Sequence, residues 1–241
     1  MRKLYLTSSP TGDYRSSEAP TYPGLNPANG MVDELKSDWK EDARCLTIAA
    51  TPDAYEINDE MAEFFKEKLV ASGLPVKEMC LCDDRNGEEM VAALDTFDML
   101  ILGGGHVPTQ NVFFKKIGLR EKIQNFDGII MGISAGTMNM ADIVYAQPEI
   151  PGESTDPAYE KFIRGLGLTK KMVLPHYQAV KDDVLDGKRL YEEITYPDSV
   201  GHTFYVLVDG SYILQRNGIE KVCGEAYQIQ DGGMRPYEEV E

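Results

Sequence analysis

One serine stands in a pattern that fits nucleophilic catalysis. Ser134 lies in the run GISAG (residues 132–136), which follows the apolar residues 129–131 and precedes a segment with helical character. A G-x-S-x-G run between a strand and a helix is typical of a nucleophile elbow, where a sharp turn exposes the serine hydroxyl. The flanking glycines remove Cβ atoms where strand and helix crowd together. We predict that Ser134 is a nucleophile; an ordinary strand-to-helix turn is the alternative.

A serine hydroxyl is a weak nucleophile and needs a general base. The sequence contains three histidines. His176 follows the predicted strand 172–174, so it comes at a strand's carboxyl end, the edge of a parallel sheet where Ser134 is also expected. His202 precedes a predicted strand and should lie at the opposite edge, whereas His106 lies in a loop expected to supply backbone donors. The positions favour His176 as the base.

Three consecutive glycines, residues 103–105, follow the predicted strand 97–102. Successive glycines can turn their N–H groups inward and form an anion-binding nest. We expect N–H groups near Gly104 and Gly105, together with that of Ala135 after the nucleophile, to hold the oxyanion of a tetrahedral intermediate. A flexible turn after a strand is the alternative interpretation of the glycine run.

The residue pattern does not identify the acidic side chain that would orient the base. The acidic candidates after His176 are Asp182, Asp183, Glu192, Asp198 and Asp209. Asp209 precedes Gly210 between two predicted strands, and Asp-Gly is typical of a type I′ hairpin turn. The pattern alone therefore favours a turn residue at position 209.

The elements that must position these residues alternate along the chain. Strands are predicted at 3–7, 45–50, 76–81, 97–102, 128–133 and 172–174, and helices at 31–40, 59–71, 88–94, 112–124 (interrupted at Gly118) and 184–195. Such alternation indicates parallel strands with right-handed crossovers. We predict one α/β domain over residues 1–241, a doubly wound, mostly parallel sheet flanked by helices.

Three local features add detail to this fold. The predicted helix 59–71 has an apolar stripe, with Asn58 placed to cap it; the stripe is Met61, Phe64, Phe65 and Leu69. Residues 203–229 are dominated by strands, and antiparallel hairpins are indicated there by the turn signals at 209–210 and 217–218. Residues 8–29 form a long irregular segment that is either mobile or laid over a site.

The composition of the chain limits which binding partners and which cellular compartment are expected. A formal charge of −16 opposes binding to nucleic acid or anionic membranes through long-range repulsion. No segment approaches the apolar length of a membrane-spanning helix. The four cysteines, Cys45, Cys80, Cys82 and Cys223, lack metal-ligand spacing and are expected to be reduced core thiols. We expect a cytoplasmic protein without a bound metal; a homodimer is left open.

The residues around the expected site resemble a known family, the peptidase E and cyanophycinase-like serine peptidases of family S51. The resemblance rests on the glycine run 103–105, the GISAG elbow at Ser134 and the LPHY segment at His176, and it covers most of the chain. These peptidases are relatives of class I glutamine amidotransferases, so the resemblance implies an amidotransferase-like (flavodoxin-like) fold and no cofactor. The amidotransferases themselves use cysteine where this chain has serine.

The resemblance also implies an order of catalytic residues: serine, histidine, acid. The family's acid is a glutamate before a glycine in a late strand–turn, and that position falls on Asp209, an aspartate one methylene shorter. The α/β-hydrolases share G-x-S-x-G but place the acid between serine and histidine. That order would need His202 as the base, preceded by Asp182, Asp183, Asp186 or Asp198.

Family members such as peptidase E cleave dipeptides with an N-terminal aspartate, using an arginine for the aspartyl side chain and an acidic residue for the free amino group. The corresponding stretches here contain Arg189 and Glu149, for which ordinary surface charges are the alternative interpretation. His106 stands where aspartyl dipeptidases tend to have asparagine, so it is a third candidate for substrate binding. The sequence thus predicts serine-dependent hydrolysis of small peptides. An esterase or amidase, or a catalytically silent binding protein of this fold, remains an alternative.

Overall fold

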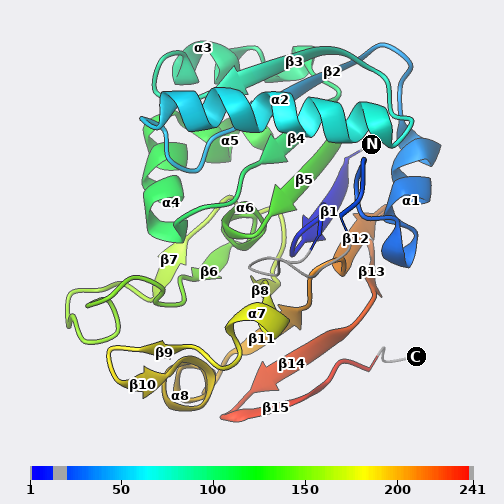
Figure 1. Cartoon of the computed structure of the whole chain (residues 1–241). Helices are drawn as coiled ribbons and strands as arrows, with labels where there is room; N and C mark the ends of the chain where they lie inside the picture. The colour runs from blue at the N-terminus through cyan, green and yellow to red at the C-terminus, as the bar shows by residue number, and fades with distance from the viewer. Residues whose placement is uncertain (1, 13–20, 239–241) are drawn as a thin grey trace.

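The computed structural model describes residues 2–12 and 21–238, and a seven-stranded sheet forms its centre (Figure 1). Five neighbouring strands of this sheet run parallel, in the spatial order β1 (Lys3–Thr7), β5 (Ile129–Ile133), β4 (Met99–Leu102), β2 (Ala43–Ile48) and β3 (Val76–Cys82). Two strands add to the β1 edge, β12 (Tyr212–Arg216) and β13 (Ile219–Cys223), with β12 antiparallel to both of its neighbours. The sheet is therefore mixed and mostly parallel, as predicted.

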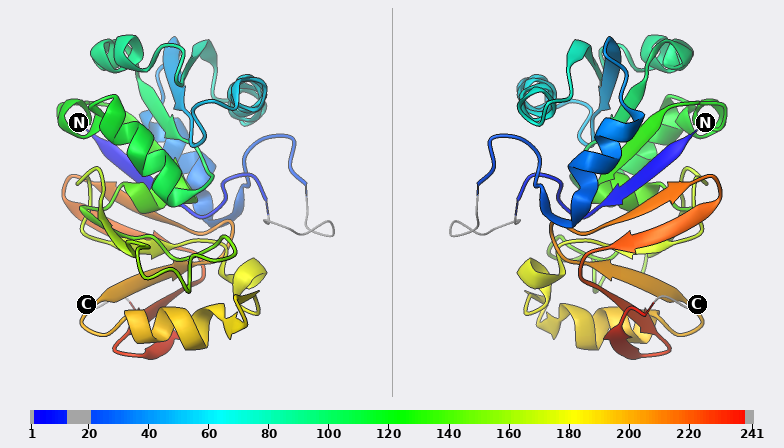
Figure 2. Two further views of the ribbon diagram at one scale, coloured as in Figure 1. Left: turned by 90° about the vertical axis from the view of Figure 1, so that its left-hand side faces the viewer. Right: turned by 90° about the vertical axis from the view of Figure 1, so that its right-hand side faces the viewer.

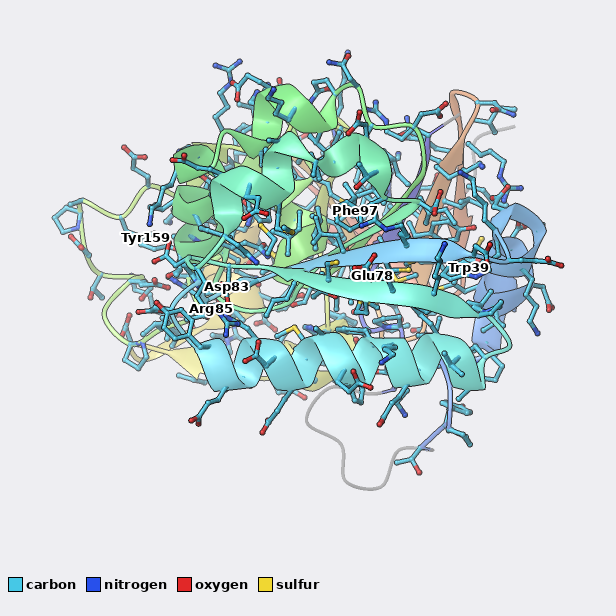
Figure 3. The ribbon with its side chains drawn as sticks, turned by 90° about the horizontal axis from the view of Figure 1, so that it is seen from above. Trp39, Glu78, Asp83, Arg85, Phe97 and Tyr159 are labelled. Atoms are coloured by element: carbon cyan, nitrogen blue, oxygen red, sulfur yellow. The ribbon has the colours of Figure 1, made fainter. Side chains whose placement is uncertain are left out.

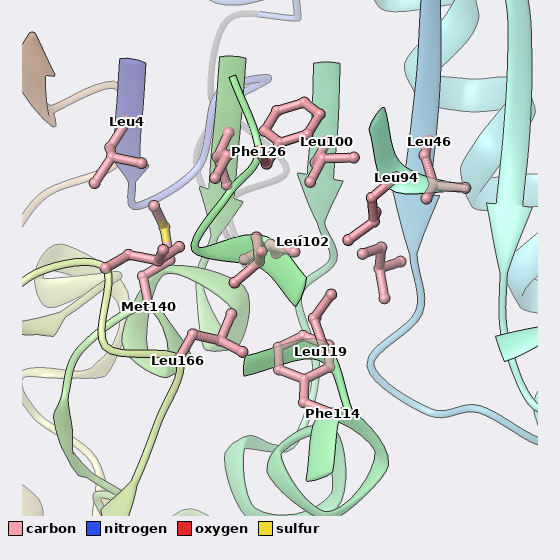
Figure 4. Packing of buried hydrophobic residues seen from close by; sticks show 14 of the residues in the cluster. Leu4, Leu46, Leu94, Leu100, Leu102, Phe114, Leu119, Phe126, Met140 and Leu166 are labelled. Carbon is pink, nitrogen blue, oxygen red and sulfur yellow. The ribbon is translucent and has the colours of Figure 1, made fainter. Parts of the chain in front are cut away.

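Helices cover both faces of this sheet (Figure 2). One face carries α1 (Met31–Asp38) and α2 (Tyr55–Ala71); the other carries α3 (Gly87–Ala92), α4 (Val107–Lys116), α5 (Leu119–Ile123) and α6 (Ala135–Asn139). Leu100 and Leu102 of β4 point to the second face, where they share a core with Phe114 and Leu119 (Figure 4). Met99 and Ile101 point to the first face, because side chains alternate along a strand. Both faces of the central strands β4 and β5 are thus buried, which explains their nearly continuous apolar sequences.

The long helix α2 differs from its predicted form at two residues. It begins at Tyr55 rather than Asp59, so Asn58 lies inside its first turns and is not the cap; its side chain donates to the carbonyl of Thr51. Phe64 is 41% exposed and does not belong to the buried stripe. Beside this end of α2, the guanidinium of Arg85 bridges Asp83 and Asp59 (Figure 3), which ties the loop after β3 to the helix.

A second, four-stranded sheet lies below the main sheet in the view of Figure 1. Its spatial order is β15 (Gly233–Pro236), β14 (Ala226–Gln230), β11 (Thr203–Leu207) and β8 (Met172–Leu174). The pair β8–β11 is parallel and the other two pairs are antiparallel. Two short ribbons flank it: β6 (Ile143–Tyr145) with β7 (Phe162–Arg164), and β9 (Val184–Leu185) with β10 (Lys188–Arg189).

The two predicted hairpin turns have different outcomes. Asn217 and Gly218 both have positive φ and connect the antiparallel pair β12–β13, so this turn is confirmed. The prediction at Asp209-Gly210 is wrong, because β11 and β12 belong to different sheets and do not pair. The chain crosses from one sheet to the other at residues 208–211, and Asp209 lies at this crossing.

The predicted helix over 184–195 is also partly wrong. Its first half is the β9–β10 ribbon, which turns at Asp186 and Gly187, both with positive φ. Its second half is a π-helix, Leu190–Thr195, followed by α8 (Tyr196–Asp198). A further short helix, α7 (Tyr177–Val180), begins directly after His176. The Asp-Gly pair at 186–187, a pair typical of hairpin turns, is where this ribbon reverses direction.

The remaining predicted elements are confirmed to within a few residues. The helix expected over 112–124 is α4 and α5, separated at Gly118, whose φ is 63°. Of the irregular segment expected over 8–29, residues 13–20 lie outside the described residues; its described part contains one 3-10 turn, Ala28–Gly30. Within the described ranges, no helix combines the length and the apolar character that crossing a membrane requires.

Candidate active site

Ser134 occupies a strained turn between β5 and α6. Its backbone angles are φ 51° and ψ −115°, which a residue with a Cβ atom rarely adopts. A Cβ atom on Gly136 would lie 2.6 Å from the carbonyl carbon of Leu102, and one on Gly132 would lie 2.6 Å from the Cα of Thr137. The two glycines therefore permit α6 to pack directly on β4 and β5, which explains the spacing of the GISAG run.

The end of β1 holds this turn in place. The N–H of Ser134 points at the carbonyl oxygens of Thr7 (3.3 Å) and Ser8 (3.2 Å). The hydroxyl of Thr137 donates to the same Thr7 carbonyl at 2.7 Å, while the Thr7 hydroxyl donates to the carbonyl of Gly132 at 2.7 Å. Because β1 is the parallel neighbour of β5, its carboxyl end lies beside the serine.

His176 and Asp209 are paired. His176 follows β8 and has a left-handed backbone (φ 60°), and only 9% of its surface is exposed. Its Nδ1 lies 2.7 Å from Oδ1 of Asp209, whose side chain has no exposed surface. A buried carboxylate must be compensated by donors or opposite charge, and here the imidazole is one of the donors.

Among the described residues, two further side chains contact Asp209, and sequence reasoning missed both. The hydroxyl of Ser8 donates to Oδ1 at 2.6 Å, and the amide of Gln178 donates to Oδ2 at 2.7 Å. Ser8 comes directly after β1, and Gln178 is two residues past His176. A signal for Ser8 was present, because it follows a strand predicted to be parallel to the one that ends at Ser134.

Ser134 and His176 line one cavity of about 850 Å³. Of the residues predicted to form the site, Gly104, Gly105, His106 and Glu149 also line it. Asp209 lies behind His176 rather than on the cavity wall, as an orienting acid would. Most of the apolar side chains that line this cavity, among the described residues, are Val107, Ile133, Met138, Ile150, Val180, Val184, Leu185 and Leu190.

The glycine run packs against the serine turn. A Cβ atom on Gly104 would lie 3.4 Å from the Cβ of Ser134 and 3.5 Å from the carbonyl oxygen of Ile133. Ala135 is the first residue of α6, and the first N–H groups of a helix have no partner within the helix. Gly104 and Gly105 thus lie beside Ser134 on the cavity wall, and Ala135 directly follows it at the start of α6.

Hydrogen bonds of Glu153 connect two cavity-lining residues, His106 and Glu149. Nε2 of His106 lies 2.8 Å from Oε1 of Glu153, and its Nδ1 lies 2.7 Å from the hydroxyl of Thr109. The other oxygen of Glu153 accepts the N–H groups of Glu149 and Ile150 at 2.9 and 3.0 Å. Glu153, which sequence reasoning missed, therefore fixes the turn that carries Glu149.

The Glu149 carboxylate is in an unusual environment. Much of the residue is open to the cavity, yet loss of water around its carboxylate raises the pKa of Glu149, and Glu153 contributes in the same direction. His106, His176 and the N–H of Val107 act in the opposite direction, since each favours the charged form. A carboxyl poised in this way can bind a cation or exchange a proton.

Arg189 and the other candidates lie elsewhere. The Arg189 side chain is 61% exposed, pairs with Glu192 and Glu193, and is not among the residues that line the cavity. The ring of His202 stacks on Phe162 with 4.3 Å between centroids, at the start of β11. Asp198 is engaged by Lys161 and the hydroxyl of Tyr145.

The model of peptidase family S51 matches residues 29–221. The chain belongs to peptidase family S51. A search of curated proteins found no match.

Two solved structures share the fold of this family S51 protein. A peptidase from an acI-B1 Actinobacterium superposes with a TM-score of 0.63 at 15% identity, covering 100% of this chain and 96% of the other. A protein assigned as a peptidase E from Listeria monocytogenes EGD-e gives 0.59 at 18% identity, covering 92% and 98%. They bear out the predicted fold, and the family match supports peptidase activity for this chain.

Proposed function

We propose that this family S51 protein is a serine peptidase that hydrolyses small peptides. The observation that carries the proposal is the 2.7 Å pair between His176 and the buried Asp209, with His176 and Ser134 on the wall of one cavity. A nucleophile, a base and a group that orients the base are the parts that acyl transfer by serine requires. The strained backbone of Ser134 is a second support, since such strain is concentrated at functional sites.

In the proposed mechanism Ser134 Oγ attacks the carbonyl carbon of the scissile bond while His176 takes the hydroxyl proton. Because Nδ1 of His176 is directed at Asp209, Nε2 is the nitrogen that accepts this proton. The protonated imidazole then donates to the leaving amine, which gives an acyl-enzyme and a free amine. In the second half, water attacks the acyl-enzyme while His176 takes its proton, and the carboxylic acid product leaves as the proton returns to Ser134. Asp209 stabilises the imidazolium in both halves.

The oxyanion of each tetrahedral intermediate is assigned to backbone N–H groups of residues 104–105 and 135. The support is that Gly104 and Gly105 line the cavity beside Ser134 and that Ala135 directly follows it at the start of α6. Backbone donors suit this role because they are fixed before the reaction and need no reorganisation as charge develops. No metal or organic cofactor takes part in the proposed chemistry.

The peptide's free amino group is assigned to Glu149, with His106 beside it. The support is that both line the cavity and that Glu153 fixes the Glu149 turn. Arg189 stays a candidate for an acidic substrate side chain, although it would have to leave its pairs with Glu192 and Glu193. Among the described residues that line the cavity none is lysine or arginine, so the cavity wall itself offers no cation to an aspartyl side chain. Specificity for an N-terminal aspartate is therefore proposed separately from the hydrolysis of small peptides in general.

Labelling and turnover of one substitution test the proposal. An active-site-directed fluorophosphonate should modify wild-type protein at Ser134, and Ser134→Ala should reduce hydrolysis by several orders of magnitude. Asp-Xaa dipeptides, other dipeptides and aryl esters should be compared. Hydrolysis of esters alone would favour an esterase, and an unlabelled, inactive wild type would favour a silent binding protein. A Ser134→Ala variant with wild-type turnover would refute the assignment.

Other features of the proposal follow from the sequence. We propose a single domain over residues 1–241, a cytoplasmic location and no nucleic-acid partner, the last because a charge of −16 repels phosphate backbones. A homodimer is the remaining partner prediction. Sedimentation equilibrium at several concentrations measures it directly.

A further inference from the structure

A buried serine after β1 is hydrogen-bonded to all three residues of the proposed triad. The Ser8 hydroxyl donates to Oδ1 of Asp209 at 2.6 Å and accepts the backbone N–H of His176 at 2.7 Å. The carbonyl oxygen of Ser8 accepts the N–H of Ser134 at 3.2 Å. Ser8 has no exposed surface. One residue outside the triad thus links nucleophile, base and acid.

Gln178 holds the same carboxylate from its other side. Its Nε2 donates to Oδ2 of Asp209 at 2.7 Å, while its Oε1 accepts the backbone N–H of Asp209 at 3.0 Å. This pair of bonds joins one amide to both the side chain and the main chain of the acid, so it restricts rotation of the carboxylate. Gln178 lies on α7, which begins immediately after His176, so one short segment positions both base and acid.

The strand pairing explains why these residues meet. β1 and β12 are antiparallel, with Thr7 opposite Tyr212. The ladder continues past the strand ends, since the N–H of Ser8 donates to the carbonyl of Ser211 at 3.3 Å and the N–H of Gly210 donates to that of Ser9 at 3.1 Å. Asp209, the residue before Gly210, therefore lies beside Ser8.

We infer that Ser8 and Gln178 are positioning residues that hold Asp209 in the orientation in which it pairs with His176. The inference rests on the proposed function. An aspartate carboxylate is close to its own backbone, so its reach to the imidazole depends on a fixed main chain and fixed side-chain torsions. Ser8 supplies the link to the His176 backbone, and Gln178 supplies the link to the Asp209 backbone. Both also donate to the buried charge.

A double-mutant cycle tests whether the two residues act through Asp209. Ser8→Ala and Gln178→Met should each lower kcat by about 10- to 100-fold with KM within about twofold, because each removes one hydrogen-bond donor from a buried charged acceptor. In an Asp209→Ala background the same substitutions should lower kcat further by less than about twofold, since the group they position is gone. Full additivity of the losses would overturn the inference.

Matched variants separate positioning from general damage. Ser211→Ala removes another buried hydroxyl two residues from Asp209, and within the described residues that hydroxyl has no hydrogen-bond partner, so kcat should stay at the wild-type value. Circular dichroism melts show which variants fold; Gln178→Met, on the half-buried short helix α7, keeps the test open should Ser8→Ala not fold.

A measurement independent of turnover distinguishes this inference from the proposed function. The low-field proton resonance of the His176 Nδ1–H, assigned by its loss in His176→Ala, should shift or broaden in Ser8→Ala and Gln178→Met and stay in place in Ser211→Ala. An unchanged resonance together with an unchanged kcat would overturn the positioning roles. A wild type that neither reacts with fluorophosphonate nor hydrolyses peptides would refute the peptidase proposal, while the resonance would still decide the positioning roles.

Discussion

The imidazole of His176 and the carboxylate of Asp209 form a 2.7 Å hydrogen bond between Nδ1 and Oδ1, and the carboxylate is sealed from solvent. The two residues come from different parts of the second half of the chain, one after β8 and one at the crossing between the two sheets. A buried carboxylate beside Nδ1 selects the tautomer in which Nδ1 carries the proton. It also stabilises the imidazolium, which is the state the proposed mechanism passes through twice.

Asp209→Asn should therefore lower kcat by about four orders of magnitude, the size seen when an amide replaces a triad carboxylate. The amide keeps the shape of the side chain but cannot stabilise a charged imidazole. Peptide hydrolysis at neutral pH measures the effect, and circular dichroism checks the fold. Asp209→Glu should also lose activity, because an added methylene must fit a site with no exposed surface. Wild-type kcat in Asp209→Asn would contradict the role of the acid.

The glycines of the elbow give a prediction on stability. In Gly136→Ala the new Cβ atom would clash with the carbonyl group of Leu102, lying 2.6 Å from its carbon and closer still to its oxygen, and neither strand nor helix can yield without disturbing the core. We expect the free energy of unfolding to fall by about 1–3 kcal/mol or more. Urea denaturation measures it. Gly233→Ala is the control, because among the described residues other than its chain neighbours no atom would lie closer than 3.9 Å to the new Cβ atom, so stability should change little. Equal stability of both variants would contradict the packing argument.

The residue pattern predicted the parts of the site that local sequence can specify, whereas Asp209 was named only through the resemblance to family S51. Ser134 and His176 each directly follow a strand, so a strand–helix alternation places them at carboxyl ends. Asp209 could not be recognised in this way, because an Asp-Gly between two strands looks the same whether the strands pair or separate. The separation of β11 and β12 into two sheets depends on contacts with β1, β8 and β14, far away in the chain.

The ribbon β9–β10 shows the same limit for short elements. Its residues have helix-like apolar spacing, and Leu190 packs in the core as a helix would place it. Two-residue strands carry too little pattern to outweigh that spacing, although Asp186-Gly187 is a turn signal. Hydrogen-bonding partners such as Ser8 and Gln178 are harder still, since their roles follow from side-chain geometry and not from any periodicity.

Burial of the cysteines predicts their reactivity. Cys45 and Cys82 have no exposed surface, and burial raises the pKa of each thiol to about 12. Only the thiolate reacts with disulfide reagents, so both should stay unmodified in the native protein at pH 8. Titration with a chromogenic aromatic disulfide, followed by mass spectrometry of each cysteine peptide, measures this. Both thiols should react once the protein is unfolded in guanidinium chloride; fast native labelling of either would contradict the described packing.

Glu149 predicts a pH dependence that is specific to substrates with a free amino group. Desolvation, joined by Glu153, raises the pKa of its carboxyl above the ordinary value, against the opposing effects of His106 and His176. A raised pKa means that the carboxylate is neutralised at a higher pH than an exposed glutamate, whose pKa is about 4.3. As the pH falls towards that window, kcat/KM for a peptide with a free amine should fall relative to its N-acetylated form, because kcat/KM reports the free enzyme.

Glu149→Gln isolates this effect. Without the carboxylate, kcat/KM for the free-amine peptide should drop by about 10- to 100-fold at neutral pH, the usual loss for a hydrogen bond to a charged group. The N-acetylated peptide should be hydrolysed as by wild type, because it presents no charge to residue 149. The ratio between the two peptides should then be independent of pH in the variant, since the titrating group is absent. A ratio that still falls in acid would place the amine on another group, and the carboxyl of Glu153, which holds the same turn, would be the next to replace.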